Sequence, residues 1–216
     1  MLHWLLYLLF PPRCVLCKEF LAKDETDLCH RCRKNAPFFK KPQTKLSFVA
    51  GWTALWYYKD ITQQSILRYK FYRKRHYAPA YGRLLAVKLQ EAGFAEFDTL
   101  TFVPVSPIRR FTRGYDQVEL LATAVAQELG VSSVRTLRKI RNTPPQSRIK
   151  DPARRRANVL GAYQAISHKD VWGKRVLLLD DIITTGATAS ECARVLLTAG
   201  AKEVYCAALA AANHKL

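Results

Sequence analysis

The sequence predicts an α/β domain with a parallel sheet and flanking helices, preceded by a small four-cysteine module. Three observations lead to this fold class. Four cysteines cluster near the N-terminus, stretches typical of strands alternate with stretches typical of helices, and the segment RVLLLDD (175–181) is a continuous apolar run that ends in two acids. Such a run is typical of a strand buried on both faces of a parallel sheet.

The chain is strongly basic. Its 216 residues include 35 Lys plus Arg against 17 Asp plus Glu, a net charge of +18, and 49% are hydrophobic. That composition supports a folded core and excludes a wholly disordered chain. No apolar run reaches the ~20 residues of a membrane-spanning helix. The charge indicates an anionic partner, which can be a nucleic acid, a membrane surface or a phosphorylated metabolite.

The first ten residues, MLHWLLYLLF, are apolar. No Lys or Arg precedes this run and no small-residue cleavage site follows it, so a secretion signal is disfavoured. We expect a short amphipathic helix packed on the protein or on a partner, with peripheral membrane association left open. The chain is therefore expected to be cytoplasmic.

The clustered cysteines form two CxxC pairs separated by eleven residues. Two such pairs can hold one tetrahedral zinc ion. A module as short as 13–34 is too small to bury a core of its own, so it needs a bound metal or a cross-link for stability. Two disulfides are the alternative, disfavoured in a reducing cytoplasm, and a redox CxxC would need only one pair. The expected zinc ligands are Cys14, Cys17, Cys29 and Cys32; Cys192 and Cys206 are expected to be buried hydrophobes.

The chain divides into three expected parts: the apolar segment and cysteine module (1–34), a linker (35–47) and the α/β domain (48–216). Within the last part, strands are expected where β-branched and aromatic residues gather, and helices where apolar residues recur at helical spacing and a glycine follows. Expected strands are 48–58, 98–105, 175–181 and 203–211, and expected helices are 79–92, 115–129 and 188–199, with a further helical stretch that begins near residue 61 and becomes basic.

The segment VLLLDDIITTGAT (176–188) has the most specific pattern. A strand ends in two acids, a turn with hydroxyl side chains and one glycine follows, and a helix begins directly after it. A helix N-terminus of this kind binds phosphate, while the acids suit sugar hydroxyls or a magnesium ion bridging to pyrophosphate. The alternative is an ordinary strand-to-helix turn. The expected ribose 5-phosphate site comprises Asp180, Asp181, Thr184, Thr185, Gly186, Ala187 and Thr188.

This segment resembles the phosphoribosyl-pyrophosphate (PRPP) signature of type I phosphoribosyltransferases. Further stretches make the chain similar, over nearly its whole length, to the ComF family of ComFC-type competence proteins. They are LFPPRCVLC with CHRC, LRYKFYRKRHYAPAYGRLLA, FVPVSPIRRFTRGYDQ and RNTPPQSRIKDPARRRANVLGAY. The chain departs from the family at Tyr115-Asp116, where the family usually has Phe-Asn.

The resemblance implies a type I phosphoribosyltransferase-like fold behind a zinc ribbon. It also implies binding of PRPP with magnesium and a role in the uptake of transforming DNA. A helicase-like translocase of the ComFA type is the partner that the resemblance implies. It does not imply a demonstrated transferase reaction, and it assigns no catalytic residue.

Cations and aromatic residues alternate in RYKFYRKRHY (68–77), and more arginines follow the strand expected at 98–105. Cations that contact phosphates and aromatics that stack on bases are typical of single-stranded DNA binding. The alternatives are a solvated face with its aromatics in the core, or arginines that bind the pyrophosphate of PRPP. The residues assigned to single-stranded DNA are Lys70, Arg73, Lys74, Arg75, Arg109, Arg110 and Arg113.

Three functions compete. A DNA-uptake factor that binds single-stranded DNA and carries a PRPP site explains the cysteines, the charge and the loop together. A phosphoribosyltransferase acting on an unidentified acceptor explains the loop, but it has little use for a charge of +18, and no base-recognition hood is visible in the sequence. A non-catalytic adaptor of the uptake helicase needs neither the acid pair nor the hydroxyl turn.

Overall fold

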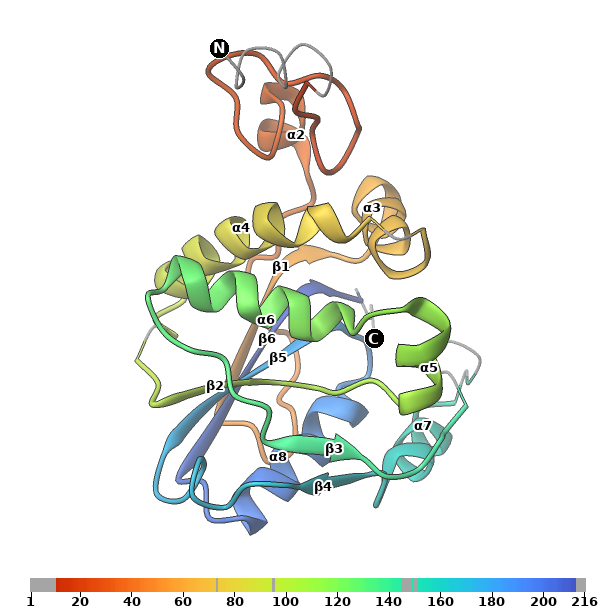
Figure 1. Ribbon diagram of the computed structural model, residues 1–216, viewed down its shortest axis with the longest axis vertical. Helices are drawn as coiled ribbons and strands as arrows, with labels where there is room; N and C mark the ends of the chain where they lie inside the picture. Colours follow the sequence, from red (N-terminus) through yellow and green to blue (C-terminus); the bar gives the residue numbers. More distant parts are fainter. Residues whose placement is uncertain (1–10, 73, 95, 145–148, 150, 213–216) are drawn as a thin grey trace.

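The structure is a computed structural model that describes residues 11–212 except 73, 95, 145–148 and 150. Figure 1 shows a small N-terminal module standing on one end of an α/β domain. The apolar helix expected over the first ten residues lies outside the described residues, as does Arg73.

A four-stranded parallel sheet in the order β1-β6-β5-β2 forms the centre of the domain (Figure 1). The predicted fold class, a parallel sheet with flanking helices behind a cysteine module, is confirmed. The strands are β1 (Gly51–Tyr57), β2 (Thr99–Phe102), β5 (Arg175–Ile183) and β6 (Glu203–Ala211).

Helices cover both faces of the sheet: α4 and α6 pack on one face and α8 on the other (Figure 1). Alternate residues of β5 enter two different cores, with Leu177 and Leu179 on the α4–α6 side and Val176 and Leu178 on the α8 side. All four are fully buried, which explains the continuous apolar run. The helices are α4 (Ala78–Glu91), α6 (Gln117–Glu128) and α8 (Ala187–Thr198).

A glycine lets α4 and α6 approach closely. A Cβ atom built on Gly82 would lie 2.6 Å from the Cβ of Ala124, which is closer than real atoms come. Any larger side chain at residue 82 would therefore push the two helices apart. This contact holds α6 against the sheet, and the first turn of α6 is part of the site described below.

Several short elements were not anticipated from the sequence. A two-stranded antiparallel sheet of β3 (Leu137–Lys139) and β4 (Tyr163–Ala165) packs against α8. Residues 140–162 lie between its two strands in the chain, and the sequence had suggested no such sheet. The other unanticipated elements are α2 (His30–Asn35), η1 (Arg75–Tyr77), α5 (Pro107–Arg113) and α7 (Pro152–Val159). The helix α3 (Asp60–Phe71) corresponds to the helical stretch expected from near residue 61.

The cysteine module is attached to α3 and α4 by buried contacts. Leu16 and Leu28 belong to the same core as Tyr81 of α4. The Arg68 guanidinium of α3 donates to the Leu16 carbonyl (2.5 Å), and Arg83 of α4 makes a two-point ion pair with Asp27. The module therefore shares the core of the α/β domain.

The segment 35–47, expected as a linker, is packed on the domain over part of its length. Phe39 and Leu46 are buried in the core on the α8 side. Among the described residues, no helix combines the length and the apolar character needed to cross a bilayer.

Candidate ligand pocket and nucleic-acid surface

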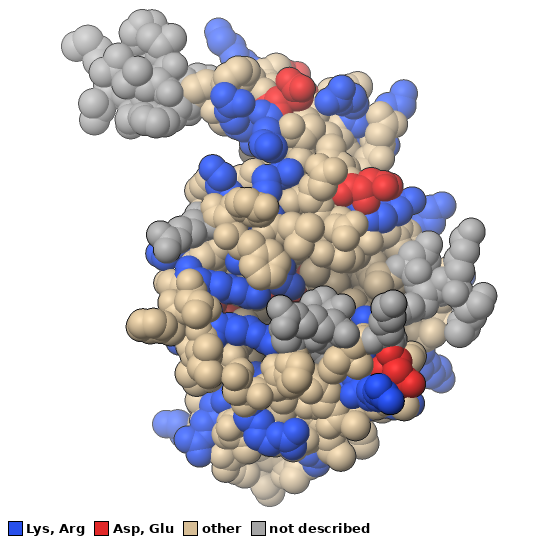
Figure 2. Space-filling view, turned by 90° about the vertical axis from the view of Figure 1, so that its right-hand side faces the viewer, with Lys and Arg blue, Asp and Glu red and all other residues tan. Residues whose placement is uncertain are grey.

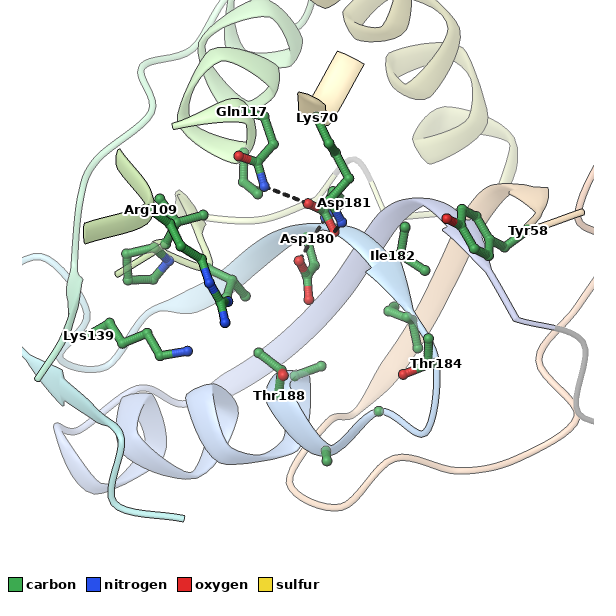
Figure 3. Close-up of a pocket in the computed structure, with 18 of the residues that line it drawn as sticks. Tyr58, Lys70, Arg109, Gln117, Lys139, Asp180, Asp181, Ile182, Thr184 and Thr188 are labelled. Atoms are coloured by element: carbon green, nitrogen blue, oxygen red, sulfur yellow. Dashed lines mark hydrogen bonds and ion pairs between the residues drawn. The ribbon is translucent and has the colours of Figure 1, made fainter. Parts of the chain in front are cut away.

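A cavity of about 420 Å³ opens at the carboxyl ends of β2 and β5. The loop Thr184–Thr188 and the first turn of α8 form one wall, and side chains from α3, α5, α6 and β3 form the others (Figure 3). All seven residues assigned to the ribose phosphate site, 180, 181 and 184–188, line this cavity. Ligands of open α/β folds bind at this edge of the sheet.

The loop is shaped by one glycine. Gly186 has a φ of +74°, and a Cβ atom there would lie 2.2 Å from Leu46, so any other residue would be both strained and displaced. The Thr185 hydroxyl accepts a hydrogen bond from the Ala187 amide (3.5 Å). The loop ends where α8 begins, so the free amide groups and positive end of that helix face the cavity.

The two acids differ in their partners. Asp181 accepts hydrogen bonds from Lys70 Nζ (2.9 Å) and from the Gln117 amide (2.7 Å), as Figure 3 shows. Burial opposes ionisation, but Lys70 and Gln117 hold the pKa of Asp181 below its usual value. Burial, together with the neighbouring Asp181 carboxylate, raises the pKa of Asp180 to about 8. At neutral pH the pair therefore carries about one negative charge, which the Lys70 ammonium offsets.

More cations reach the cavity from the opposite side. Arg109 of α5 and Lys139 of β3 extend into it, as Figure 3 shows. Burial, with the Arg109 charge nearby, lowers the pKa of Lys139 to about 8. Lys139 was missed in the sequence, although it lies two residues after the buried Leu137, and alternate residues of a strand share a face.

Asp116, the departure from the family pattern, has a structural role. Its carboxylate accepts hydrogen bonds from the amides of Val118 and Glu119 at the start of α6, and from the amide of Val105 after β2. The side chain thus caps α6 and ties it to the segment that follows β2. These contacts lie beneath the cavity wall that Gln117 and Val105 form.

The residues assigned to single-stranded DNA fall into two groups. The first group lies in the cavity. It includes Lys70, whose side chain is only 16% exposed and is paired with Asp181. Arg109 and Arg113 are partly buried and line the cavity. The members that are exposed and lie outside the cavity lining are Lys74, Arg75 and Arg110.

These two basic segments meet in space. Arg75 lies over the Tyr115 ring (4.8 Å) and donates to the Gly114 carbonyl (3.1 Å), and Arg113 of α5 lies over the Phe71 ring (4.8 Å). Figure 2 looks onto this face of the molecule and shows Lys and Arg side chains gathered across it. Residues about forty positions apart in the chain therefore form one basic surface at the mouth of the cavity.

The aromatic residues of 68–77 divide between core and surface. Tyr69 and Tyr77 are buried, as the alternative interpretation expected, whereas Phe71 (58%) and Tyr72 (69%) are exposed. On α5, Phe111 is 89% exposed. We define the mouth surface as these three exposed rings with the cations around them: Phe71, Tyr72, Phe111, Lys74, Arg75, Arg109, Arg110 and Arg113.

The four clustered cysteines converge. Their sulfur atoms all lie within 4.8 Å of one another, and the Cys17 and Cys29 sulfurs are 3.5 Å apart. A tetrahedron with Zn–S bonds of about 2.3 Å has edges of about 3.8 Å, so the donor set fits zinc. Cys192 and Cys206, expected as buried hydrophobes, are fully buried.

Comparisons with known proteins agree with this architecture. A family model described as a phosphoribosyl transferase domain matches residues 119–216, and one described as a double zinc ribbon domain matches residues 5–44. The chain is 28% identical to the DNA utilization protein YhgH of Salmonella typhimurium, over 91% of this chain and 96% of that protein. It is 25% identical to the Competence protein F of Haemophilus influenzae, over 93% of this chain and 97% of that protein.

The resemblance to the ComF family is confirmed. The cysteine module is a structural zinc ribbon, supported by both the family match and the converging sulfurs. The cavity belongs to a phosphoribosyltransferase-like domain. A shorter match, 43% identical over 37% of this chain and 23% of that protein, relates the chain to a ribose-phosphate pyrophosphokinase of Gloeobacter violaceus.

Proposed function

We propose that this ComF-type protein acts in DNA uptake by binding single-stranded DNA on the mouth surface, and that its cavity takes PRPP or a related ribose phosphate. The names of the two full-length relatives, a DNA utilization protein and a competence protein, support the cellular role. The same proposal includes a ComFA-type helicase-like translocase as partner and a cytoplasmic location. It also includes the division of the chain into 1–34, 35–47 and 48–216.

One observation carries the DNA-binding part: exposed aromatic rings lie among cations at the mouth of the cavity. A surface of this composition suits a single strand, because cations contact phosphates while exposed rings stack on unpaired bases of any sequence. A base pair in a duplex is already stacked and cannot use these rings. We therefore expect the protein to prefer single strands over duplexes and to show little sequence preference.

The ligand part rests on the cavity lining. The Thr184–Thr188 loop suits the 5-phosphate, and the acid pair suits the ribose hydroxyls. Carboxylate oxygens are also ligands that Mg²⁺ prefers, so Asp180 and Asp181 would hold magnesium together with the pyrophosphate. For this, Asp181 must give up its ion pair with Lys70.

Truncating the exposed rings tests the DNA-binding proposal. We expect the double variant Phe71→Ala, Phe111→Ala to bind a labelled single strand more weakly, by about 1–3 kcal/mol for each lost stacking contact, in fluorescence anisotropy. Trp172→Ala is the matched control, because Trp172 is 72% exposed but precedes β5 at the opposite edge of the sheet. Equal affinities for wild type and the double variant would refute the stacking surface.

A transferase is the second candidate, and the β3–β4 sheet favours it. This two-stranded sheet brings Lys139 and Tyr163 to the cavity, as a hood would bring acceptor-binding groups. Lys139, with its pKa lowered to about 8, can exchange a proton near neutral pH. Pyrophosphate release from PRPP with Mg²⁺, measured with candidate acceptors, would establish the transferase. If calorimetry shows that PRPP binds but no acceptor causes pyrophosphate release, the cavity binds PRPP without catalysing its transfer.

A further inference from the structure

The ribose phosphate cavity and the mouth surface share side chains. Phe71, Arg109 and Arg113 of the mouth surface line the same cavity as the Thr184–Thr188 loop, together with Lys70. A strand held on the mouth surface therefore lies directly over the entrance of a phosphate-binding cavity. The cavity volume of about 420 Å³ is near the lower end of the range for small-molecule pockets, so it has room for a terminal nucleotide and not for a folded strand.

The group that the loop is suited to hold occurs in two kinds of molecule. The 5-phosphate of a ribose phosphate is a phosphomonoester on a primary carbon, and so is the 5′-terminal phosphate of a nucleic-acid strand. Each carries close to two negative charges at neutral pH, whereas a phosphodiester inside a strand carries one and is esterified on both sides. A loop that forms one wall of a cavity at the start of a helix can surround the terminal group but not the internal one.

The acid pair does not prevent an anion from entering in the absence of magnesium. Lys70 Nζ lies 2.9 Å from Asp181 and offsets the charge of that carboxylate. The described cavity lining holds four Lys and Arg side chains against the two acids. Arg109 and Lys139 reach into the cavity from the opposite wall (Figure 3). The cavity without magnesium thus presents a net positive lining to a strand end.

We propose that this cavity receives the 5′-phosphorylated end of single-stranded DNA, with the terminal phosphate at the Thr184–Thr188 loop and the strand leaving between α3 and α5 past Phe71 and Arg113. This inference rests on the proposed function, because it requires that the mouth surface binds single strands. It assigns the phosphate loop a ligand besides PRPP. The protein would then recognise the 5′-phosphorylated ends of single strands.

Three internally labelled oligonucleotides of one sequence test the proposal: one with a 5′-phosphate, one with a 3′-phosphate and one with neither. We expect anisotropy titrations to show that the 5′-phosphate tightens binding about tenfold, the effect of one hydrogen bond to a charged group, and that the 3′-phosphate does not. The two phosphorylated strands carry equal charge, so the comparison separates recognition of the end from attraction to charge. Saturating PRPP with Mg²⁺ should remove the advantage of the 5′-phosphate.

Loop and control variants complete the test. Thr185→Val should lose the 5′-phosphate advantage, whereas Thr123→Val, on the exposed face of α6, should keep it. Circular dichroism shows whether Thr185→Val is folded. If it is not, the competition between PRPP and the 5′-phosphorylated strand on wild type decides the test. Equal binding of all three oligonucleotides, or equal gains from 5′- and 3′-phosphates, would overturn this inference alone. Failure to bind any of them would overturn the proposed function.

Discussion

Asp180 and Asp181 are neighbours in the chain, yet their surroundings shift their pKa values in opposite directions. Burial raises the pKa of Asp180 to about 8, while Lys70 and Gln117 overcome the effect of burial at Asp181 and lower its pKa. Two adjacent carboxyl groups in one cavity rarely ionise together, because their charges repel. The pair can therefore hold one proton and exchange it when a cation or ligand arrives.

This difference predicts a pH dependence of stability. Asp180 binds its proton in the folded protein but not in the unfolded chain between about pH 4 and pH 8, so its contribution to folding becomes less favourable as pH rises through that window. We therefore compare the free energy of unfolding of Asp180→Asn with that of wild type. The variant's advantage over wild type should be larger at pH 8 than at pH 5, by at least about 1.4 kcal/mol, the equivalent of one pKa unit. Urea denaturation at the two pH values measures the gain.

Asp181→Asn is the control with the opposite sign. It leaves the Lys70 ammonium, whose side chain is 16% exposed, without a charged partner, and should lower the free energy of unfolding at both pH values. An equal gain for Asp180→Asn at pH 5 and pH 8 would contradict the raised pKa of Asp180.

The phosphate loop could be predicted from the sequence because its strand, turn and helix start are contiguous in 176–188. The partners of Asp181 could not be predicted in the same way. Lys70 and Gln117 lie 111 and 64 residues away in the chain, and only the packing of α3 and α6 brings them to the strand end. Lys70 was accordingly assigned to the DNA surface, whereas the structure pairs it with an acid inside the cavity.

At the scale of elements, the sequence indicated the long apolar strands and the helices that end at glycines. It did not reveal β3 and β4, because strands of three residues are too short for a period of two to stand out. Nor did it reveal α5, whose start depends on Ser106 accepting a hydrogen bond from the Arg109 amide. The β3–β4 sheet and the exposed Phe111 ring of the mouth surface therefore emerged only from the structure, whereas the arginines of α5 were assigned from the sequence.

The zinc ribbon shares its core with α3, so loss of zinc should affect both. We expect Cys29→Ser to lose the metal and to lower the melting temperature, since the ribbon packs Leu16 and Leu28 into the domain core. Metal analysis and thermal unfolding measure these effects, and hydrogen exchange should report faster exchange in α3. Cys192→Ser, a buried cysteine away from the ribbon, should keep its zinc. Full zinc occupancy in Cys29→Ser would contradict the four-cysteine assignment.

At the scale of the whole molecule, the net charge of +18 matters through its placement. Lys and Arg side chains are spread over the face drawn in Figure 2. Lys169, Lys174 and Lys202 lie at the other edge of the sheet, in the turns before β5 and β6. If DNA binds the mouth surface, only the first group should contact phosphates; if binding follows net charge alone, both groups should contribute equally.

The salt dependence of single-stranded DNA binding distinguishes these cases most directly. Each phosphate contact contributes about 0.7 to the slope of log affinity against log salt, so the triple variant Arg109→Gln, Arg110→Gln, Arg113→Gln should flatten the slope by about two units. Lys169→Gln, Lys174→Gln, Lys202→Gln removes the same charge and should keep the wild-type slope. Equal flattening in both triple variants, or none in either, would contradict a single-stranded DNA site at the mouth of the cavity.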